Sequence, residues 1–517
     1  MRWMRLVSPC LLAPLLAHPQ GGRGAWNSFG GDPQRTGWNR TETALTSANI
    51  KDLKLEWTAS LDSPAKELTN LTAPVVRSNV HTSRGIKDFV IVAGASDRLY
   101  AIDGDTGQIT WQKTLSTQAT PSRSASWLCP NALTATPVIG PLPGKGNAVF
   151  ALASDGKLHA FNLVSGEDLL PPTPFVPAFA KTWSLNLVNN VLYTTTSQGC
   201  NGVKSGVYAL DLADPNRTVT SFTVSASGAG IWGRAGAALT AGGKIIVETG
   251  DGPYDPTTGN YSDTVLALSP KDLDLVDYFA PSNREWVTKK DLDMGCMSAV
   301  VFNFKTWELV AAAGKEGVIF LLDAKSLGGT GHRTPLYRSA GFANGEINFA
   351  GKGFWGAFST WEDAAGTRWL VAPAWGPPTA ATKFSNLYGP TPNGSLMAFR
   401  VELQGDRPAL TPAWNSVDMK LPTPAVIANG MVFALADGDD GAQFGPHGNL
   451  LDTPARKART GHAILYALDA ATGSILFSSG GIIRSFSHFS GLTVAGGRVY
   501  LGTQDGTVYA FGLGSQQ

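Results

Sequence analysis

A short pattern of apolar and small residues recurs eight times along the chain. Each copy has a bulky apolar residue, then usually an aromatic or apolar residue, an Ala, a second bulky apolar residue and a polar residue. The copies are Leu99–Asp103, Leu158–Asn162, Val207–Asp211, Val265–Ser269, Ile319–Asp323, Leu396–Arg400, Leu465–Asp469 and Val508–Gly512. A short apolar run with alternating character of this kind indicates a β-strand.

The copies lie about 43 to 77 residues apart, which suits a four-stranded sheet with its loops. One such sheet cannot bury its faces alone, so repeated sheets stack around an axis. The pattern therefore predicts an all-β fold, an eight-bladed β-propeller of four-stranded antiparallel blades.

The first copy continues through Thr106–Gly107 to Trp111, and parts of this continuation return at Ser165–Gly166 and Thr472–Gly473. Glycine permits the positive φ that a tight turn between two strands requires. A Trp on the next strand offers a large apolar face. We expect these indoles to pack between neighbouring blades.

The last copy, Val508–Gly512, leaves its blade without an outer strand. Leu53–Trp57 has the alternation of a strand, and we expect it to complete that blade. Pairing an early segment with the last one removes the exposed edges of an open ring.

Composition agrees with one large β domain, which we assign to residues 25–517. The chain has 517 residues with 59 Gly and 15 Trp, only 16% charged residues and a net charge of +1. Without a basic surplus, nothing favours a nucleic-acid partner.

The first residues resemble a targeting segment. Arg2 and Arg5 precede an apolar stretch from Leu6 to Ala17, which indicates a signal peptide within about residues 1–24. This stretch is too short to span a bilayer. We therefore expect a periplasmic or secreted protein with no membrane span.

Three cysteines remain after removal of such a segment: Cys129, Cys200 and Cys296. In an oxidising compartment they suggest one disulfide and one free thiol. Cys129 and Cys200 lie in loops rich in Pro or Gly and are the favoured pair, although sequence leaves the connectivity open. No C-x-x-C-H motif occurs, so no covalent haem is expected.

Several motifs resemble the pyrroloquinoline quinone (PQQ) dependent alcohol dehydrogenases. Phe29–Pro33 and Ala48–Trp57 are similar to the opening of that family, and Ala101–Trp111 matches its docking pattern A-x-D-x-x-T-G-x-x-x-W. Thr249–Gly252 and Gly314–Val318 are similar to its polyvinyl-alcohol dehydrogenase branch. The resemblance covers about residues 25 to 513.

The resemblance implies oxidation of an alcohol, secondary and polymeric alcohols included, with PQQ and Ca²⁺ as cofactors. Electrons would pass to a separate c-type cytochrome. Such a site needs a flat aromatic floor, donors for the quinone oxygens and a metal ion.

Trp232 is the candidate floor, since the glycines around it let backbone approach a ring. In the resembling enzymes a metal ligand follows this Trp by about one hairpin, and Asp251 stands at that spacing. The alternatives are a blade-packing indole for Trp232 and a turn aspartate for Asp251.

Asp291 and Asp293 lie at i and i+2, on the same side of an extended chain. The family places here a carboxylate that is both general base and metal neighbour. The alignment does not decide between the two, although we favour Asp293, which is nearer the following apolar strand. The alternative is a solvated loop pair.

Lys315 departs from its own repeat, because other blades place Asp155 or Asp505 near this turn. In the family an Arg or Lys here stabilises negative charge on the quinone oxygens. The alternative is an exposed hairpin lysine.

One position departs from the family. A metal-binding Glu is expected just before Gly202–Gly206, where this chain has Cys200 and Asn201. Thiols are poor ligands for a hard cation. Three outcomes follow: Asn201 substitutes, the metal binds more weakly, or the site has decayed.

Two rival functions remain. One is a non-catalytic repeat scaffold that binds proteins or envelope polymers, and the other is a lectin-like polysaccharide binder. The acidic run Asp437–Gly441 lies in a long insertion of the seventh blade and predicts either a second calcium loop or a solvated turn. Insertions in blades six and seven suggest a lid.

Overall fold

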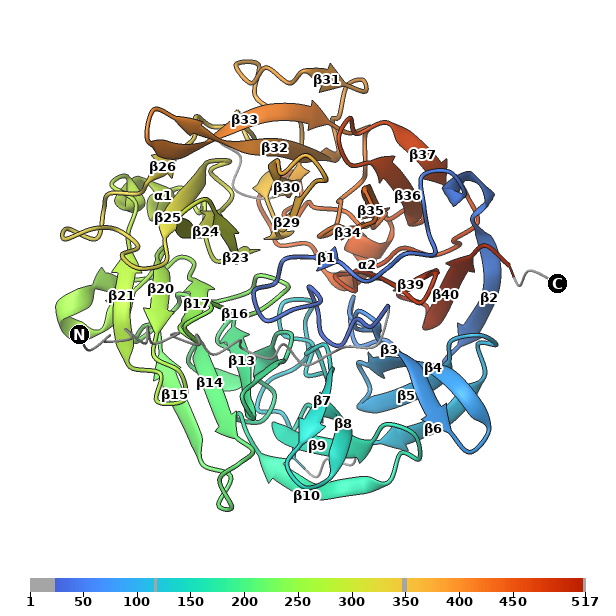
Figure 1. Cartoon of the computed structure of the whole chain (residues 1–517). Helices are drawn as coiled ribbons and strands as arrows, with labels where there is room; N and C mark the ends of the chain where they lie inside the picture. Colours follow the sequence, from blue (N-terminus) through green and yellow to red (C-terminus); the bar gives the residue numbers. More distant parts are fainter. Residues whose placement is uncertain (1–23, 116–118, 346–350, 515–517) are drawn as a thin grey trace, which may run out of the picture.

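Eight antiparallel sheets form a closed ring in the computed structural model, which describes residues 24–115, 119–345 and 351–514 (Figure 1). The predicted eight-bladed β-propeller is confirmed. Within the described ranges the helices are short: α1 (Arg284–Lys289), α2 (Thr453–Lys457) and the 3₁₀ turns η1 (Ile50–Asp52), η2 (Cys200–Gly202) and η3 (Pro256–Thr258).

The four strands of each blade follow one another from the innermost, beside the axis, to the outermost. Blades one to four are β3 (Val75–Thr82), β4 (Gly85–Gly94), β5 (Arg98–Asp103) and β6 (Ile109–Thr114); β7 (Val138–Leu142), β8 (Gly146–Leu152), β9 (Lys157–Asn162) and β10 (Asp168–Pro174); β12 (Asn186–Val188), β13 (Val191–Ser197), β14 (Gly206–Asp211) and β15 (Val219–Thr223); β16 (Ala238–Leu239), β17 (Ile245–Glu248), β20 (Val265–Leu268) and β21 (Leu275–Phe279).

Blades five to eight have the same order of strands. They are β23 (Val300–Phe304), β24 (Trp307–Ala313), β25 (Ile319–Asp323) and β26 (Tyr337–Arg338); β29 (Ser359–Glu362), β30 (Arg368–Trp375), β32 (Gly394–Gln404) and β33 (Arg407–Asn415); β34 (Val426–Ala428), β35 (Met431–Ala436), β36 (Ile464–Asp469) and β37 (Ile475–Ser478); β38 (Leu492–Ala495), β39 (Arg498–Gly502), β40 (Thr507–Gly512) and β2 (Lys54–Ser60).

Short additional strands lie beside the blades. They are β1 (Trp38–Asn39), β11 (Lys181–Thr182), β18 (Tyr254–Asp255), β19 (Asn260–Tyr261), β22 (Met297–Ser298), β27 (Gly353–Phe354), β28 (Gly356–Ala357) and β31 (Asn386–Leu387). The repeated sequence pattern forms the third strand of every blade, where its apolar residues are buried between neighbouring sheets.

Ring closure occurs as predicted. Strand β2 pairs with β40, with Leu55 opposite Phe511 and Thr58 opposite Tyr509. All of the expected segment except Leu53 therefore belongs to the outer strand of blade eight, and no blade of the described ring lacks this strand.

The predicted docking of indoles between blades is also confirmed. Trp111 leaves β6 of blade one and donates its indole N–H to the Leu163 carbonyl of blade two at 3.0 Å. Its ring lies against Gly166, where an added Cβ would be 2.8 Å from the indole. Trp57 meets Gly107 and Trp414 meets Gly473 in the same manner.

The segment before β2 crosses the middle of the ring (Figure 1). Between Trp26 and Asn39 it makes hydrogen bonds to the innermost strand of each blade in turn. Its partners are Val76, Ile139, Asn186, Leu239, Val301, Thr360, Ile427 and Val494. Arg35 anchors this segment, since its buried guanidinium donates to the carbonyls of Phe29, Ala237 and Leu185.

Residues 1–23 of the expected signal peptide lie outside the described residues, so that assignment stays a prediction. Among the described residues no helix is long and apolar enough to cross a membrane.

Substitution of the docking glycine tests the contact between blades. Gly166 and Gly144 both belong to blade two and have nearly the same left-handed φ, +72° and +71°, but only Gly166 faces an indole. We expect Gly144→Ala to cost about 1–2 kcal/mol of backbone strain, and Gly166→Ala to cost about 1–3 kcal/mol more because the added methyl displaces Trp111. Urea unfolding midpoints measure both, and equal values would show that the indole contact contributes nothing.

Candidate functional site

A pocket of about 380 Å³ lies at the centre of the ring. Its walls come from connections between blades and from loops of several blades. All five candidate residues from the sequence line it: Trp232, Asp251, Asp291, Asp293 and Lys315. The structure therefore brings together side chains from blades four and five that lie up to 83 residues apart in sequence.

Close backbone contacts hold the loops of these residues together. The Gly250 N–H donates to the Gly230 carbonyl at 2.8 Å, and the Trp232 N–H donates to the Gly295 carbonyl at 2.9 Å. A Cβ on Gly295 would lie 2.4 Å from the nitrogen of Gly250. These loops can approach so closely only because glycines stand at the contacts.

The same principle places Lys315 beside Asp293. The Lys315 N–H donates to the Asp293 carbonyl at 3.1 Å, and a Cβ on Gly314 would lie 2.3 Å from that carbonyl oxygen. The turn after β24 is therefore fixed against the loop that carries the carboxylates.

Three carboxylates form an acidic cluster. Oxygens of Asp251, Asp291 and Asp293 all lie within 4.8 Å of one another. Oxygen ligands at such spacing suit a hard cation such as Ca²⁺. One carboxylate oxygen of Asp293, Oδ1, is buried without a hydrogen-bond partner, and a cation would satisfy it.

The segment that contains Asp291 and Asp293 is not extended, contrary to the expectation from the sequence. Asp291 lies two residues beyond the end of helix α1 in a left-handed conformation, with φ of 54°, and its N–H donates to the Thr288 carbonyl. Aspartate is one of the residues that tolerates this conformation. The expectation of a solvated pair is also wrong for Asp293, whose side chain is 1% exposed, whereas that of Asp291 is 47% exposed.

Lys315 is buried, and the alternative of an exposed hairpin lysine is wrong. Its side chain is 5% exposed and forms an ion pair with Asp293 and a second one with Asp291 at 3.3 Å. Burial opposes its charge, but Asp293 and Asp291 outweigh that effect and raise the pKa of Lys315. Burial and the neighbouring Asp293 raise the pKa of Asp291 to about 7.

Aromatic side chains surround the cluster. A Cβ on Gly250 would lie 2.2 Å from the Trp232 ring, so backbone supports that indole directly. Trp355 and Trp375 stack with ring centres 4.3 Å apart, and the Lys315 ammonium lies 5.2 Å from the centre of the Trp355 ring. The pocket thus offers flat apolar surfaces beside its charges.

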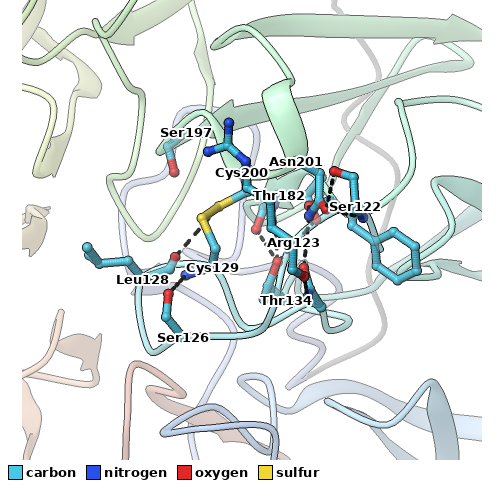
Figure 2. Close-up of a disulfide and its surroundings, with 12 residues drawn as sticks. Ser122, Arg123, Ser126, Leu128, Cys129, Thr134, Thr182, Ser197, Cys200 and Asn201 are labelled. Atoms are coloured by element: carbon cyan, nitrogen blue, oxygen red, sulfur yellow. Dashed lines mark hydrogen bonds between the residues drawn. A yellow bond between two sulfur atoms is a disulfide. The ribbon is translucent and has the colours of Figure 1, made fainter. Parts of the chain in front are cut away.

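The favoured disulfide, Cys129–Cys200, is confirmed, with a Cα–Cα distance of 5.5 Å (Figure 2). Cys296 is the buried free thiol. The Asn201 side-chain oxygen accepts hydrogen bonds from Ser122, and its nitrogen donates to Asn131. These contacts occupy the amide, so Asn201 does not replace the metal-binding Glu of the resembling family.

The acidic run of blade seven is not a solvated turn. Asp437 and Asp439 are 2% and 0% exposed. An Asp439 oxygen lies 2.6 Å from His488 Nδ1 and 3.7 Å from the Arg456 guanidinium. Burial lowers the pKa of His488 to about 4 although Asp439 opposes this shift. The insertion itself supplies Gly441, Gln443 and Arg456 to the pocket wall.

Sequence reasoning missed three cations that line the pocket: Lys181, Arg234 and Arg456. Lys181 stands two residues before Trp183, and Arg234 stands two residues after Trp232. A single charge beside a Trp in an apolar segment was the available signal. The sequence contained no such signal for Arg456, because its helix lies in a long insertion.

Comparisons with known proteins give two kinds of match, one to an assembly factor and one to dehydrogenases. A PQQ-repeat family model, described as outer membrane protein assembly factor BamB, matches residues 34–221. BamB of Yersinia pestis is 33% identical over 125 residues, which is 24% of this chain and 28% of that protein. Much of the relative therefore lies outside the match.

Solved structures extend the similarity over the whole ring. Quinohemoprotein alcohol dehydrogenase from Comamonas testosteroni has 15% identity and a TM-score of 0.61, covering 96% of this chain and 82% of its own. A europium-containing methanol dehydrogenase has 12% identity and a TM-score of 0.60, covering 95% and 98%. At these identities the likeness establishes the fold.

The family match over residues 34–221 and the likeness of the whole ring to these structures are consistent with a PQQ-repeat β-propeller. The described part of the chain forms eight blades, with an acidic cluster and a buried lysine in the central pocket.

The buried ion pair can be tested by its effect on stability. Lys315→Met would leave the Asp293 carboxylate unpaired, and we expect a loss of about 3–5 kcal/mol. Adding Asp293→Asn should recover much of that loss, because the uncompensated charge is then gone. Urea unfolding in the presence of EDTA measures both.

The exposed pair of Lys113 and Asp168, at 3.2 Å, is the matched control. Lys113→Met should change stability by at most about 1 kcal/mol. If Lys315→Met were equally mild, the described ion pair would not be a significant constraint.

Proposed function

We propose that this protein is a PQQ- and Ca²⁺-dependent dehydrogenase that oxidises an alcohol in the periplasm or outside the cell. The acidic cluster beside a buried, ion-paired lysine in the central pocket is the observation that carries this proposal. Structural scaffolds do not need these charges on their axis, because blade packing uses apolar side chains.

The residues fit the cofactors on three counts. The pocket volume of about 380 Å³ lies within the usual range for small-molecule sites. Trp232 offers a flat ring supported by backbone, and the unpartnered Asp293 oxygen suits a cation. Asp251 and Asp293 would hold the metal, and Trp232 and Lys315 would contact the quinone.

When bound, PQQ with Ca²⁺ would supply the two-electron acceptor for oxidation of an alcohol to a carbonyl compound. Asp291 would accept the hydroxyl proton, since its carboxylate is half exposed in the pocket while that of Asp293 is buried against Lys315. Lys315 would stabilise developing negative charge from a fixed position. We propose a separate c-type cytochrome for the electrons, because the sequence has no C-x-x-C-H motif.

The second candidate is a scaffold function. The family model that supports it is described as assembly factor BamB, and its match to residues 34–221 ends within blade three of this chain. The residues that form the acidic cluster all lie beyond that match. This observation favours the enzyme, and the scaffold remains the outcome if no cofactor binds.

Turnover separates the two functions. Protein reconstituted with PQQ and Ca²⁺ should reduce an artificial electron acceptor in the presence of a primary, secondary or polymeric alcohol. Lys315→Gln should lower kcat by about 10²- to 10³-fold, the usual effect of losing one donor to a developing oxyanion. The exposed Lys289→Gln is the control. If the wild-type protein neither binds PQQ nor oxidises any of these alcohols, the dehydrogenase proposal is wrong and the scaffold function replaces it.

Metal binding distinguishes the roles of the carboxylates. Tb³⁺ is a luminescent substitute for Ca²⁺ and should be sensitised by the nearby Trp232. We expect Asp293→Asn and Asp251→Asn to weaken Tb³⁺ binding by at least tenfold, because each removes a charged ligand. Asp291→Asn should retain more metal affinity while losing turnover. If Asp291→Asn lost the metal and Asp293→Asn retained it, the two roles would be reversed.

A further inference from the structure

Two buried cations stand where the central pocket meets a second, smaller cavity of about 40 Å³. Lys181 and Arg234 line both spaces and are 9% and 7% exposed. Lys181 belongs to β11 at the entry to blade three, and Arg234 follows the Trp232 loop of blade four. Their position between two cavities gives a ligand access to both charges.

Neither cation is fully satisfied by the described protein. Arg234 Nη1 is buried without a hydrogen-bond partner. Within the described ranges, Lys181 Nζ has neither an ion pair nor a hydrogen bond, and its contact is the Trp183 ring at 5.5 Å. Burying an unpaired charge costs several kcal/mol. Such groups are expected to have a partner that arrives from outside.

Nearby acids do not remove this surplus of positive charge. Asp439 already pairs with Arg456 and contacts His488. Asp437 lies near Arg234, but its burial raises the pKa of its carboxyl well above the ordinary value and favours the neutral form. Burial, with Arg234 and Arg456 nearby, lowers the pKa of Lys181 to about 7. An added negative group would favour the charged form of Lys181 and would pair with Arg234.

The surroundings suit an oxyanion. The smaller cavity is lined by hydroxyl-bearing side chains: Thr69, Thr72, Thr134, Thr136 and Ser184. The Thr134 hydroxyl already donates to the Thr182 carbonyl at 2.8 Å, so Thr69, Thr72 and Thr136 are the candidate donors to an anion. Ser184 Oγ donates to the Arg234 carbonyl at 2.8 Å, which fixes the backbone of that residue. A planar guanidinium can bind a carboxylate through two parallel hydrogen bonds, and an ammonium adds a point charge that attracts the same group.

We propose that Lys181 and Arg234 form an anion-binding subsite that accepts a carboxylate. The carboxylate has two sources: an organic ligand lying in the larger pocket, or a small free dicarboxylate in the smaller cavity. The subsite does not depend on the proposed dehydrogenase function, because its residues are not members of the acidic cluster and would bind an anion without a metal ion.

Three probes distinguish the sources: malonate, PQQ, and the trimethyl ester of PQQ, which keeps the quinone and lacks the charges. Quenching of tryptophan fluorescence reports binding, since Trp183 and Trp232 line the pocket. We expect Lys181→Met to weaken binding of the charged probes by at least tenfold and to leave the ester unchanged. Lys289→Met, an exposed lysine, is the control.

Stability provides a second measurement. Lys181→Met removes an unpaired buried charge while keeping an unbranched side chain, so its urea midpoint without ligand should equal or exceed that of the wild type. Arg234→Lys, which keeps the charge, should retain more affinity for the charged probes than Arg234→Gln.

The results for the anion-binding subsite can be distinguished from the results for the proposed dehydrogenase function. Binding of malonate that depends on Lys181, without any binding of PQQ, supports the subsite and contradicts the proposed function. If Lys181→Met weakens the binding of PQQ but not that of malonate, the carboxylate belongs to an organic ligand in the larger pocket. The subsite is wrong if Lys181→Met binds every charged probe like the wild type, or if the wild type binds none of them.

Discussion

Closure of the ring is the constraint on which the rest of the molecule depends. Each blade buries its faces against two neighbours, and blade eight obtains its outer strand only through the pairing of β2 with β40. The central pocket exists because the inner ends of the blades meet around one axis. An open ring would expose sheet faces and strand edges and would separate the loops that line the pocket.

The pocket contains charged side chains of both signs, whereas the contacts between blades are mainly apolar. The carboxylates with Lys315 line this pocket, and so do Lys181 and Arg234. Charges interact more strongly where water is excluded, so both groups polarise a molecule bound in the pocket. Apolar packing between blades supplies the stability that allows these costly groups to remain on the axis.

Repetition explains what could be predicted from sequence. The blade number, the closing strand and the docking indoles follow from a pattern that each blade repeats, and Lys315 stood out because it departs from that pattern. Its burial was not visible, because that depends on the approach of Gly314 to the Asp293 backbone. The resemblance to a family suggested Trp232 and Asp251, and the structure brings both to the pocket.

Residues outside the repeat were harder to assign. The sequence predicted either a calcium loop or a solvated turn for Asp437–Gly441, because the partners of Asp439, His488 and Arg456, lie 49 and 17 residues away. Lys181 and Arg234 were missed because single charges near a Trp are common on surfaces, and only the ring shows that they face inward. Local pattern therefore predicts the blades, whereas tertiary contacts decide which charged residues are buried.

The segment from Trp26 to Asn39 also has a consequence for the time course of folding. Its hydrogen bonds reach the innermost strand of all eight blades, from Val76 near one end of the chain to Val494 near the other. A ribosome makes this segment before any of its partners, yet its last contact forms only after blade eight has been synthesised. Contacts over such sequence separations form slowly. The earliest part of the ring is thus among the last to be completed, and until then the nascent chain carries unpaired strands that are prone to aggregation.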